Sequence, residues 1–285
     1  MAPEYVSLYK TGVLKHRAQE AAKRLEACDL CPRQCRIDRA TAEKGVCRTG
    51  REAKVASYGP HFGEERPLVG RGGSGTIFFT SCNLRCIFCQ NYEISQLREG
   101  HHVSAEKLAG IMLSLQNSGC HNINFVSPSH AIAQILEALV IAAGRGLRVP
   151  LVYNSGGYDS VDALKLLDGV ADIYMPDIKY MDASVGERLS GVKNYPQIVK
   201  DAIREMHRQV GDLVVDERDV AVRGLLVRHL VLPGQLAGTD EAMKFLADEI
   251  SKNTYVNIMD QYYPYYKAFD ITPLNRRITR EEFKA

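Results

Sequence analysis

The sequence predicts an α/β fold in which a mostly parallel sheet is covered by helices. Short apolar runs alternate with longer segments of helical periodicity, which is the pattern of parallel strands joined by helices. Polar or sulfur-bearing residues follow the strands, which indicates a shared site at their carboxyl ends. Six such units form an incomplete version of the (β/α)8 barrel, a partial (β/α)6 TIM-like barrel. We expect its strands at residues 76–80, 122–127, 149–154, 173–177, 225–232 and 255–259.

The composition indicates an ordinary globular protein. The 285 residues suffice for one large domain or one domain with a small appendage, and 45% are hydrophobic and 25% charged. A net charge of +2 gives no reason to expect nucleic acid or an anionic membrane surface as a partner. No signal-peptide pattern and no apolar run of ~20 residues is found. Eight cysteines clustered in such a chain favour metal binding in a reducing cytoplasm.

The chain begins with a charged, helix-forming segment at residues 9–27, and four clustered cysteines follow. Four thiolates make a closed site, and two interpretations stay open: zinc or a second [4Fe–4S] cluster. Pro32 and Gly45 suit a compact loop around a metal. Interleaved arginines would neutralise the thiolates. The cysteines of this four-cysteine segment are Cys28, Cys31, Cys35 and Cys47, and the arginines are Arg33, Arg36, Arg39 and Arg48.

Residues 50–70 are interrupted by glycine and proline and are expected to form an extended connector. We therefore divide the chain at residue 70. The first part, residues 1–70, holds the helix, the four-cysteine segment and the connector. The second part, residues 71–285, holds the partial barrel and a C-terminal tail.

The helices between the strands follow from capping and periodicity. Ser104 is the expected N-cap of a helix that ends near residue 119. Residues 212–224 are expected to form a small hairpin before the fifth strand. The other expected helices cover residues 130–143, 160–167 and 195–210, and one more begins near residue 239.

Three cysteines, Cys82, Cys86 and Cys89, follow the first strand with gaps of three and two residues. Soft sulfur ligands suit iron–sulfur clusters or zinc. A structural zinc or an ordinary electron-transfer cluster takes four protein ligands. A cubane cluster held by three thiolates leaves one iron open to an outside ligand.

The other strand ends carry polar side chains as well. Asp177 and Lys179 could bind a ligand or form a structural ion pair at the rim of the barrel. His229 could pack in the barrel wall or touch a ligand, and Cys120 is expected to be a buried apolar residue. The remaining strand-end residues are Ser127, Ser129, Asn154 and Arg228.

The C-x3-C-x2-C pattern, with the aromatic Phe88 before its last cysteine, resembles the signature of the radical S-adenosylmethionine (SAM) superfamily. That resemblance implies a [4Fe–4S] cluster on the three cysteines, with SAM on the open iron. Reductive cleavage of SAM gives a 5′-deoxyadenosyl radical that abstracts hydrogen from a substrate. Over residues 28–265 the chain looks most similar to the pyruvate formate-lyase activating enzymes, in a branch with an N-terminal four-cysteine segment and largely unassigned function.

The resemblance also implies contacts for SAM. Asp177 and Lys179 match a D-x-K pattern that contacts SAM, Arg228 matches an arginine near it, Asn154 falls where the ribose is contacted, and Phe88 would lie near the adenine. The family's Gly-Gly-Glu is replaced by residues 127–130, where the backbone or side chain of Ser129 would hold the SAM amino group and Ser127 would be a further contact for SAM. Further departures are Tyr153 in place of an acidic residue and Gln261 or Tyr262 in place of a histidine.

These departures leave the substrate open. The first hypothesis is an activase that acts on a glycine of a partner protein, and the second is modification of another peptide or a small metabolite. A hypothesis of another class is a non-catalytic iron–sulfur electron carrier. The enzyme hypotheses imply an electron donor, flavodoxin or ferredoxin, and a protein substrate for the activase. Membrane and nucleic-acid partners are not expected.

Overall fold

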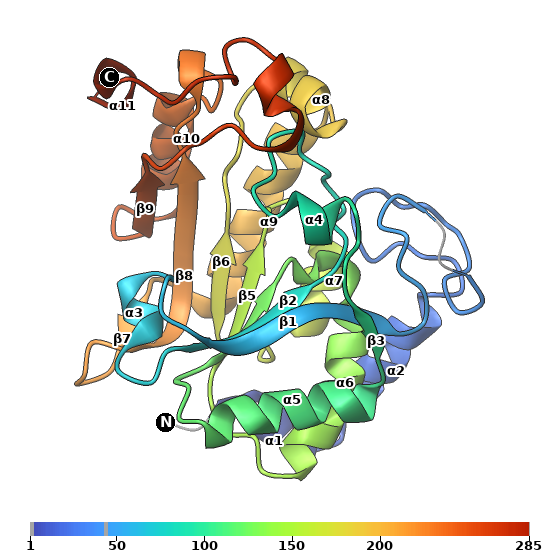
Figure 1. Ribbon diagram of the computed structural model, residues 1–285. Coiled ribbons are helices and arrows are strands. Elements are labelled where there is room, and N and C mark those ends of the chain that lie inside the picture. Colours follow the sequence, from blue (N-terminus) through green and yellow to red (C-terminus); the bar gives the residue numbers. More distant parts are fainter. Residues whose placement is uncertain (1–2, 43–44, 285) are drawn as a thin grey trace.

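The computed structural model describes residues 3–42 and 45–284, and its centre is a nine-stranded sheet (Figure 1). Neighbouring strands in the main part of the sheet are parallel, in the order β2-β4-β5-β6-β8-β9. All six expected strands are present, so the prediction of an α/β fold with a mostly parallel sheet is confirmed. These strands are β2 (Ser74–Phe79), β4 (Ile123–Val126), β5 (Leu151–Ser155), β6 (Ile173–Pro176), β8 (Ala221–Leu230) and β9 (Tyr255–Met259).

The expected extended connector is wrong in part, because it contains a long strand. β1 (Ala53–His61) pairs antiparallel with β2, and β3 (His101–Val103) pairs antiparallel with β1. Pro60 was a reason to expect no strand here. β3 pairs with β1 only at residues Ala53 to Val55, so one edge of β1 has no partner strand at Pro60. The N–H that proline lacks is therefore not needed for a hydrogen bond between strands. The division at residue 70 stays a prediction, and β1 and β2 pair across it.

The first expected helix is divided into α1 (Tyr5–Lys10) and α2 (Val13–Lys23) at Gly12, whose φ is +80°. α5 (Ala105–Asn117) begins as expected, because the Ser104 side chain accepts a hydrogen bond from the Lys107 N–H at 3.2 Å. The other α-helices are α3 (Arg66–Val69), α4 (Tyr92–Ser95), α6 (Ile132–Gly144), α7 (Val161–Leu164), α8 (Ala183–Ser190), α9 (Tyr195–Val210), α10 (Thr239–Phe245) and α11 (Arg280–Lys284).

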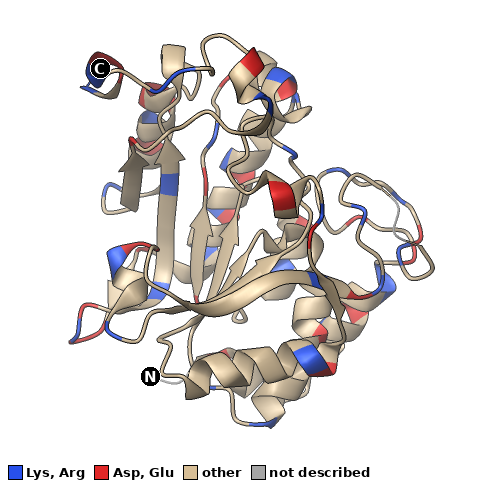
Figure 2. Ribbon diagram, viewed as in Figure 1, with Lys and Arg blue, Asp and Glu red and all other residues tan. Residues whose placement is uncertain are grey.

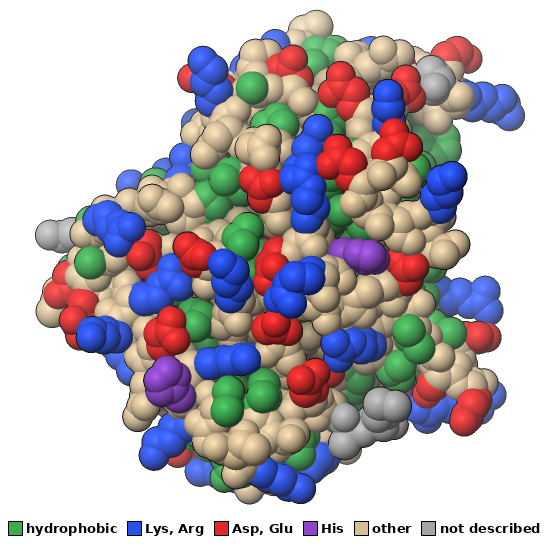
Figure 3. Space-filling view, turned by 180° about the vertical axis from the view of Figure 1, so that it is seen from behind, with side chains coloured by type: hydrophobic (Ala, Val, Ile, Leu, Met, Phe, Trp, Pro, Cys, Tyr) green, Lys and Arg blue, Asp and Glu red, His purple; other side chains and the backbone are tan. Residues whose placement is uncertain are grey.

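The helices bury the sheet and leave a mixed surface. α2 packs against α6 and α6 against α5, and apolar residues of these helices join those of the strands in one large core. The expected hairpin is present, because β7 (Val214–Val215) pairs antiparallel with β8. Charges of both signs are interspersed along the ribbon and over the back face (Figures 2 and 3). In the described residues no helix is long and apolar enough to cross a membrane.

Asp172, directly before β6, makes the stability of the fold depend on pH. Its carboxylate accepts the Leu151 N–H at 2.9 Å, and burial raises its pKa to about 7. Between the unfolded pKa of about 3.9 and this value, the folded state binds the extra proton, so its stability falls as pH rises. We expect Asp172→Asn to be more stable than the native chain at pH 8. Its advantage should shrink by about 1.4 kcal/mol per unit between pH 7 and pH 5.

Urea unfolding of both proteins at pH 5, 6, 7 and 8 measures this difference. The variant leaves all other titrating groups in place, so the comparison isolates Asp172. A difference that does not change with pH would show that the Asp172 carboxyl is ionised throughout this range in the folded chain.

Candidate functional site

The three-cysteine loop follows β2 directly, at the carboxyl end of the parallel strands. Hydroxyl and amide groups surround its sulfur atoms. Ser190 Oγ donates to Cys86 Sγ at 2.9 Å, Ser95 Oγ lies 3.1 Å from Cys89 Sγ, and the Leu84 N–H donates to Cys82 Sγ at 3.4 Å. Hydrogen bonds to sulfur are a common feature of iron–sulfur sites and help to set their reduction potentials.

Two thiols of this loop, Cys82 and Cys89, hold their protons when no metal is bound. Burial raises the pKa of Cys82, and it raises the pKa of Cys89 to about 11, where the neighbouring Cys86 adds to the shift. Thiolates at neutral pH therefore require a metal to replace the protons. Within the described residues, no three His, Cys, Asp or Glu side chains gather closely enough to hold a single ion. A cubane cluster binds each thiolate through a different iron and so places its ligands further apart.

A cavity of about 270 Å³ opens between the three-cysteine loop and the ends of β6, β8 and β9. Its wall combines two thiols, a group of charged side chains and several aromatic rings. Phe88, which the sequence placed near an adenine, is 7% exposed and packs edge-on against Tyr180 and Tyr262. Of the residues predicted for the site, the cavity is lined by Cys86, Cys89, Phe88, Asp177, Lys179 and Arg228.

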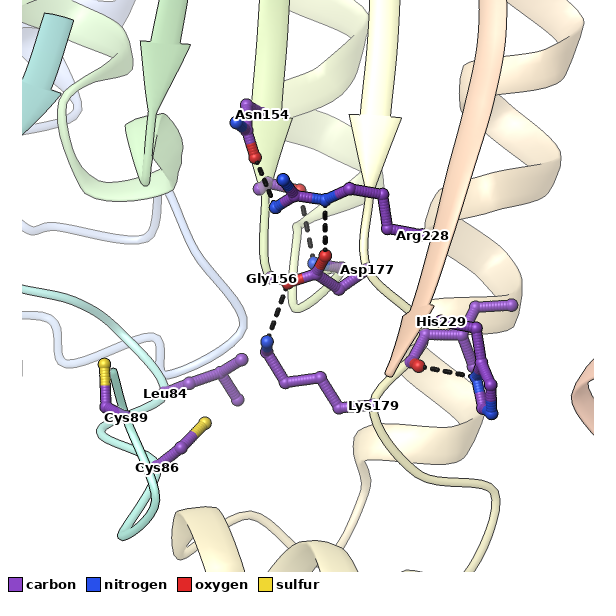
Figure 4. Close-up of polar contacts among 12 residues, drawn as sticks. Leu84, Cys86, Cys89, Asn154, Gly156, Asp177, Lys179, Arg228 and His229 are labelled. Carbon is purple, nitrogen blue, oxygen red and sulfur yellow. Dashed lines mark hydrogen bonds and ion pairs between the residues drawn. The ribbon is translucent and has the colours of Figure 1, made fainter. Parts of the chain in front are cut away.

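The charged group in this cavity is centred on Asp177 (Figure 4). One carboxylate oxygen accepts from Arg228 Nε at 2.9 Å, and the other accepts from Lys179 Nζ at 2.7 Å. Arg228 also donates to Asn154 Oδ1 at 2.9 Å, so residues from three strand ends meet here. Burial favours the neutral form of Asp177, but the charges of Arg228 and Lys179 outweigh burial and lower its pKa. Asp177 is therefore ionised, and the pKa of Lys179 is raised by this pairing against the effect of burial.

Glu64 joins this group, although the sequence gave no reason to select it. Its side chain is 8% exposed, and Oε2 lies 3.8 Å from Arg228 Nη1. Burial raises the pKa of Glu64, and the charge of Arg228 opposes that rise. Glu64 lies in the segment that was expected to be a connector, and its neighbour Glu65 accepts a hydrogen bond from Asn257 of β9 at 3.0 Å.

Ser127 and Ser129 have surroundings different from those expected for a SAM amino group. Ser129 is 3% exposed and lies near the Asp159 carboxylate, which accepts from Tyr153 Oη at 2.8 Å and from Ser155 Oγ at 2.5 Å. Ser127 has a left-handed backbone, with φ of +58°. Neither serine belongs to the cavity wall in the described residues. Asp159, a buried carboxyl beside β5, was missed because it follows the strand by several residues.

His229 and Cys120 are buried in the packed interior of the protein. His229 is fully buried, with Nδ1 2.9 Å from the Ile178 carbonyl and Nε2 2.9 Å from Thr239 Oγ1. It packs in the wall of the sheet. Cys120 is 3% exposed within the apolar core, as predicted.

The four-cysteine segment is attached directly to the three-cysteine loop. Arg33 donates to the carbonyls of Asn83 at 2.8 Å and Leu84 at 3.2 Å, and to that of Ser190 at 3.1 Å. Ser190 is the residue that donates to Cys86 Sγ, and its hydroxyl also meets Tyr180 Oη at 2.8 Å. One arginine thus fixes the position of the N-terminal segment against the loop. Arg33 donates to backbone carbonyls, which every residue has, so a sequence pattern cannot predict these contacts.

The arrangement defines a class: an α/β protein with a sulfur-ligand loop and a charged cavity at the carboxyl ends of parallel strands. Residues 76–246 match the radical SAM superfamily. An uncharacterized protein of Methanocaldococcus jannaschii, MJ0674, is 34% identical over 291 aligned residues, which cover 99% of this chain and 78% of that protein. The chain belongs to the radical SAM superfamily, and the resemblance found in the sequence is confirmed at this level.

Two solved structures are similar in part. The cobalamin-dependent SAM radical enzyme OxsB is 16% identical with a TM-score of 0.42, covering 75% of this chain and 31% of its own. A radical SAM methyltransferase from Sphaerobacter thermophilus is 12% identical with a TM-score of 0.47, covering 73% of this chain and 61% of its own. This chain thus spans less than two thirds of either protein. Membership in the superfamily implies a [4Fe–4S] cluster, SAM and an electron donor.

Proposed function

We propose that Cys82, Cys86 and Cys89 hold the [4Fe–4S] cluster and that SAM binds in the adjoining cavity of a partial (β/α)6 barrel. The observation that carries this proposal is the cavity itself. It joins two thiols of the loop, an ionised Asp177–Lys179–Arg228 group and an aromatic wall. When bound, the cluster and SAM supply a 5′-deoxyadenosyl radical after one-electron reduction.

The residues of the cavity have separate tasks in this proposal. Lys179 and Arg228 provide the donors for the carboxylate of SAM, and Asp177 holds both cations in place. Asn154 keeps the Arg228 guanidinium oriented through its side-chain oxygen. Phe88 provides an apolar surface for the adenine, and its ring is held by two tyrosines.

The amino group of SAM needs a separate acceptor. Ser129 stays the proposed substitute for the missing Gly-Gly-Glu, with Ser127 as a further SAM contact, and Ser129 would have to turn from Asp159 towards the cavity to serve. Gln261 lines the cavity and offers a side-chain carbonyl without such a rearrangement.

For the substrate, we propose first a glycine of a partner protein, as in the activases that the sequence resembles. Modification of another peptide or of a small metabolite is the second candidate. Flavodoxin or ferredoxin is the proposed electron donor. The proposed cytoplasmic location follows from the clustered cysteines, which need a reducing compartment as free thiols.

The test is dithionite-driven SAM cleavage by protein purified without oxygen, with 5′-deoxyadenosine as the measured product. The native chain should form it, and Cys82→Ala/Cys86→Ala/Cys89→Ala should form at least 100-fold less. Cys120→Ala is the matched control, because this buried cysteine is not among the residues that line the two cysteine cavities. A native chain that carries its full iron and forms no 5′-deoxyadenosine would contradict intrinsic SAM cleavage and favour an iron–sulfur electron carrier.

A further inference from the structure

The four cysteines of the N-terminal segment line one cavity. Cys28, Cys31 and Cys47 are buried and Cys35 is partly exposed. The same cavity is lined by Arg39 and by His130, which comes from a distant part of the chain. The four thiols therefore belong to one site, and the rest of the fold contributes to its wall.

Four thiols that line one cavity suit either a zinc ion or a [4Fe–4S] cluster. Zinc requires four sulfur atoms at about 2.3 Å from one point. Among the described residues, which include all four cysteines, no such group for a single ion exists. The backbone also comes close to the site, since a Cβ added at Gly45 would lie 3.3 Å from Cys35 Sγ and 2.9 Å from Ile37 Cδ1. A cubane cluster takes one thiolate on each iron, and the hydrogen bond from His130 to the backbone before the three-cysteine loop favours a redox-active group here.

Arg39 gives the site a permanent positive charge. The residue is 2% exposed, and its guanidinium stays protonated in proteins. It donates to Cys28 Sγ at 3.4 Å, to the Thr49 carbonyl at 2.7 Å and to the His130 carbonyl at 2.8 Å. In the described part of the chain it forms no ion pair with a carboxylate. A buried cation requires a nearby anion, and metal-bound thiolates supply one.

His130 connects this cavity to the three-cysteine loop. Its Nε2 lies 2.9 Å from the Thr80 carbonyl, which can only accept, so Nε2 carries the proton. Its Nδ1 is buried without a partner among the described residues. Thr80 stands two residues before Cys82. The imidazole thus borders one cysteine site and is hydrogen-bonded to the backbone that leads into the other.

We infer that a second iron–sulfur cluster is held by Cys28, Cys31, Cys35 and Cys47. One electron passes from this second cluster to the three-cysteine site, and His130 lies on the path between the two sites. A low-potential one-electron donor reduces the second cluster, which is reoxidised when the electron moves on, and no bond is made or broken. The inference rests on the proposed function only in assigning a cluster to the three-cysteine loop.

Metal analysis tests the first part. In Cys82→Ala/Cys86→Ala/Cys89→Ala, purified without oxygen, we expect about four irons and about four sulfides per chain and no zinc. The reduced protein should show the paramagnetic signal of a [4Fe–4S] cluster. About one zinc with no iron, or a folded chain that binds neither metal, would overturn the inference.

The rate at which reduced flavodoxin reduces the three-cysteine cluster tests the second part. We expect His130→Phe, which fills the space without a donor, to slow this rate at least tenfold with the iron content unchanged. His130→Gln, which keeps a side-chain N–H, should stay within threefold of the native rate. A native rate in His130→Phe would overturn the role of His130.

A second measurement covers the case in which His130→Phe loses iron. In Cys35→Ala/Cys47→Ala, which removes the second cluster, flavodoxin should reduce the remaining cluster at least tenfold more slowly. A native rate there would overturn the electron route. Failure of the proposed function is distinguishable, because it appears as absence of 5′-deoxyadenosine with dithionite, whereas iron content and reduction rates require no SAM.

Discussion

Asp177→Asn is expected to lower the free energy of unfolding by about 3 kcal/mol, because it leaves two cations without their common anion. The Asp177 carboxylate holds Lys179 Nζ at 2.7 Å and Arg228 Nε at 2.9 Å. Asparagine has the same shape as aspartate and can accept one of these hydrogen bonds. The loss of stability therefore measures the contribution of the negative charge. The two cations would repel each other and leave their positions, and we expect SAM to bind about tenfold more weakly, or by about 1.4 kcal/mol.

The pH dependence of this difference has a definite sign. The pKa of Asp177 is lowered in the folded chain, since Arg228 and Lys179 outweigh the effect of burial. The stability it contributes is present above the unfolded pKa of about 3.9 and is lost as pH falls through the lower folded value. The difference between variant and native chain should thus be constant from pH 5 to pH 8 and shrink only in more acidic solution.

Asp182→Asn is the matched control for this prediction. Asp182 is an aspartate at the start of α8, where its side chain accepts from the N–H groups of Ser184 and Val185. Asparagine is an equally good N-cap, so this variant should unfold at the same urea concentration as the native chain. Urea unfolding and SAM titration measure both variants. An Asp177→Asn variant as stable as the control would show that the ion pairs at this site contribute nothing net to folding.

Much of the site could be predicted because parallel strands bring distant positions together by rule. The ends of consecutive strands meet at one edge of the sheet, so Asp177 and Arg228 could be assigned to one site without knowing any contact. The three-cysteine loop was found from the spacing of its cysteines, and its place after β2 assigned it to the same edge. What the sequence predicted best is therefore what depends on strand order and direction.

Other features depend on side-chain direction and long-range packing, which a sequence pattern does not encode. Ser129 follows its strand as expected, but it lies near Asp159 and does not line the cavity. β1 was missed because Pro60 interrupts its pattern, and Glu64 was missed with it. The surroundings of Arg39 also depend on long-range packing, since one of its hydrogen-bond partners, His130, lies 91 residues away in the chain. The sequence suggested only that Arg39 neutralises thiolates.

Arg39→Met should strongly destabilise the four-cysteine segment. It removes the charge that balances the thiolates, and it leaves the Thr49 and His130 carbonyls without a donor. Each buried carbonyl that loses its partner costs about 1–3 kcal/mol. We expect stability to fall by about 4 kcal/mol, as for a buried ion pair that loses one member. The iron held by the four cysteines should fall below half of its native amount.

Two companion variants separate charge from geometry. Arg36→Met removes an arginine of the same segment whose side chain is 61% exposed and pairs with Asp29, so it should cost no more than about 1 kcal/mol and keep the iron. Arg39→Lys keeps the charge but cannot reach three acceptors with one planar group. If charge balance governs metal binding, the lysine variant keeps its iron while losing stability. If Arg39→Met keeps both iron and stability, the anion beside Arg39 is not a set of metal-bound thiolates.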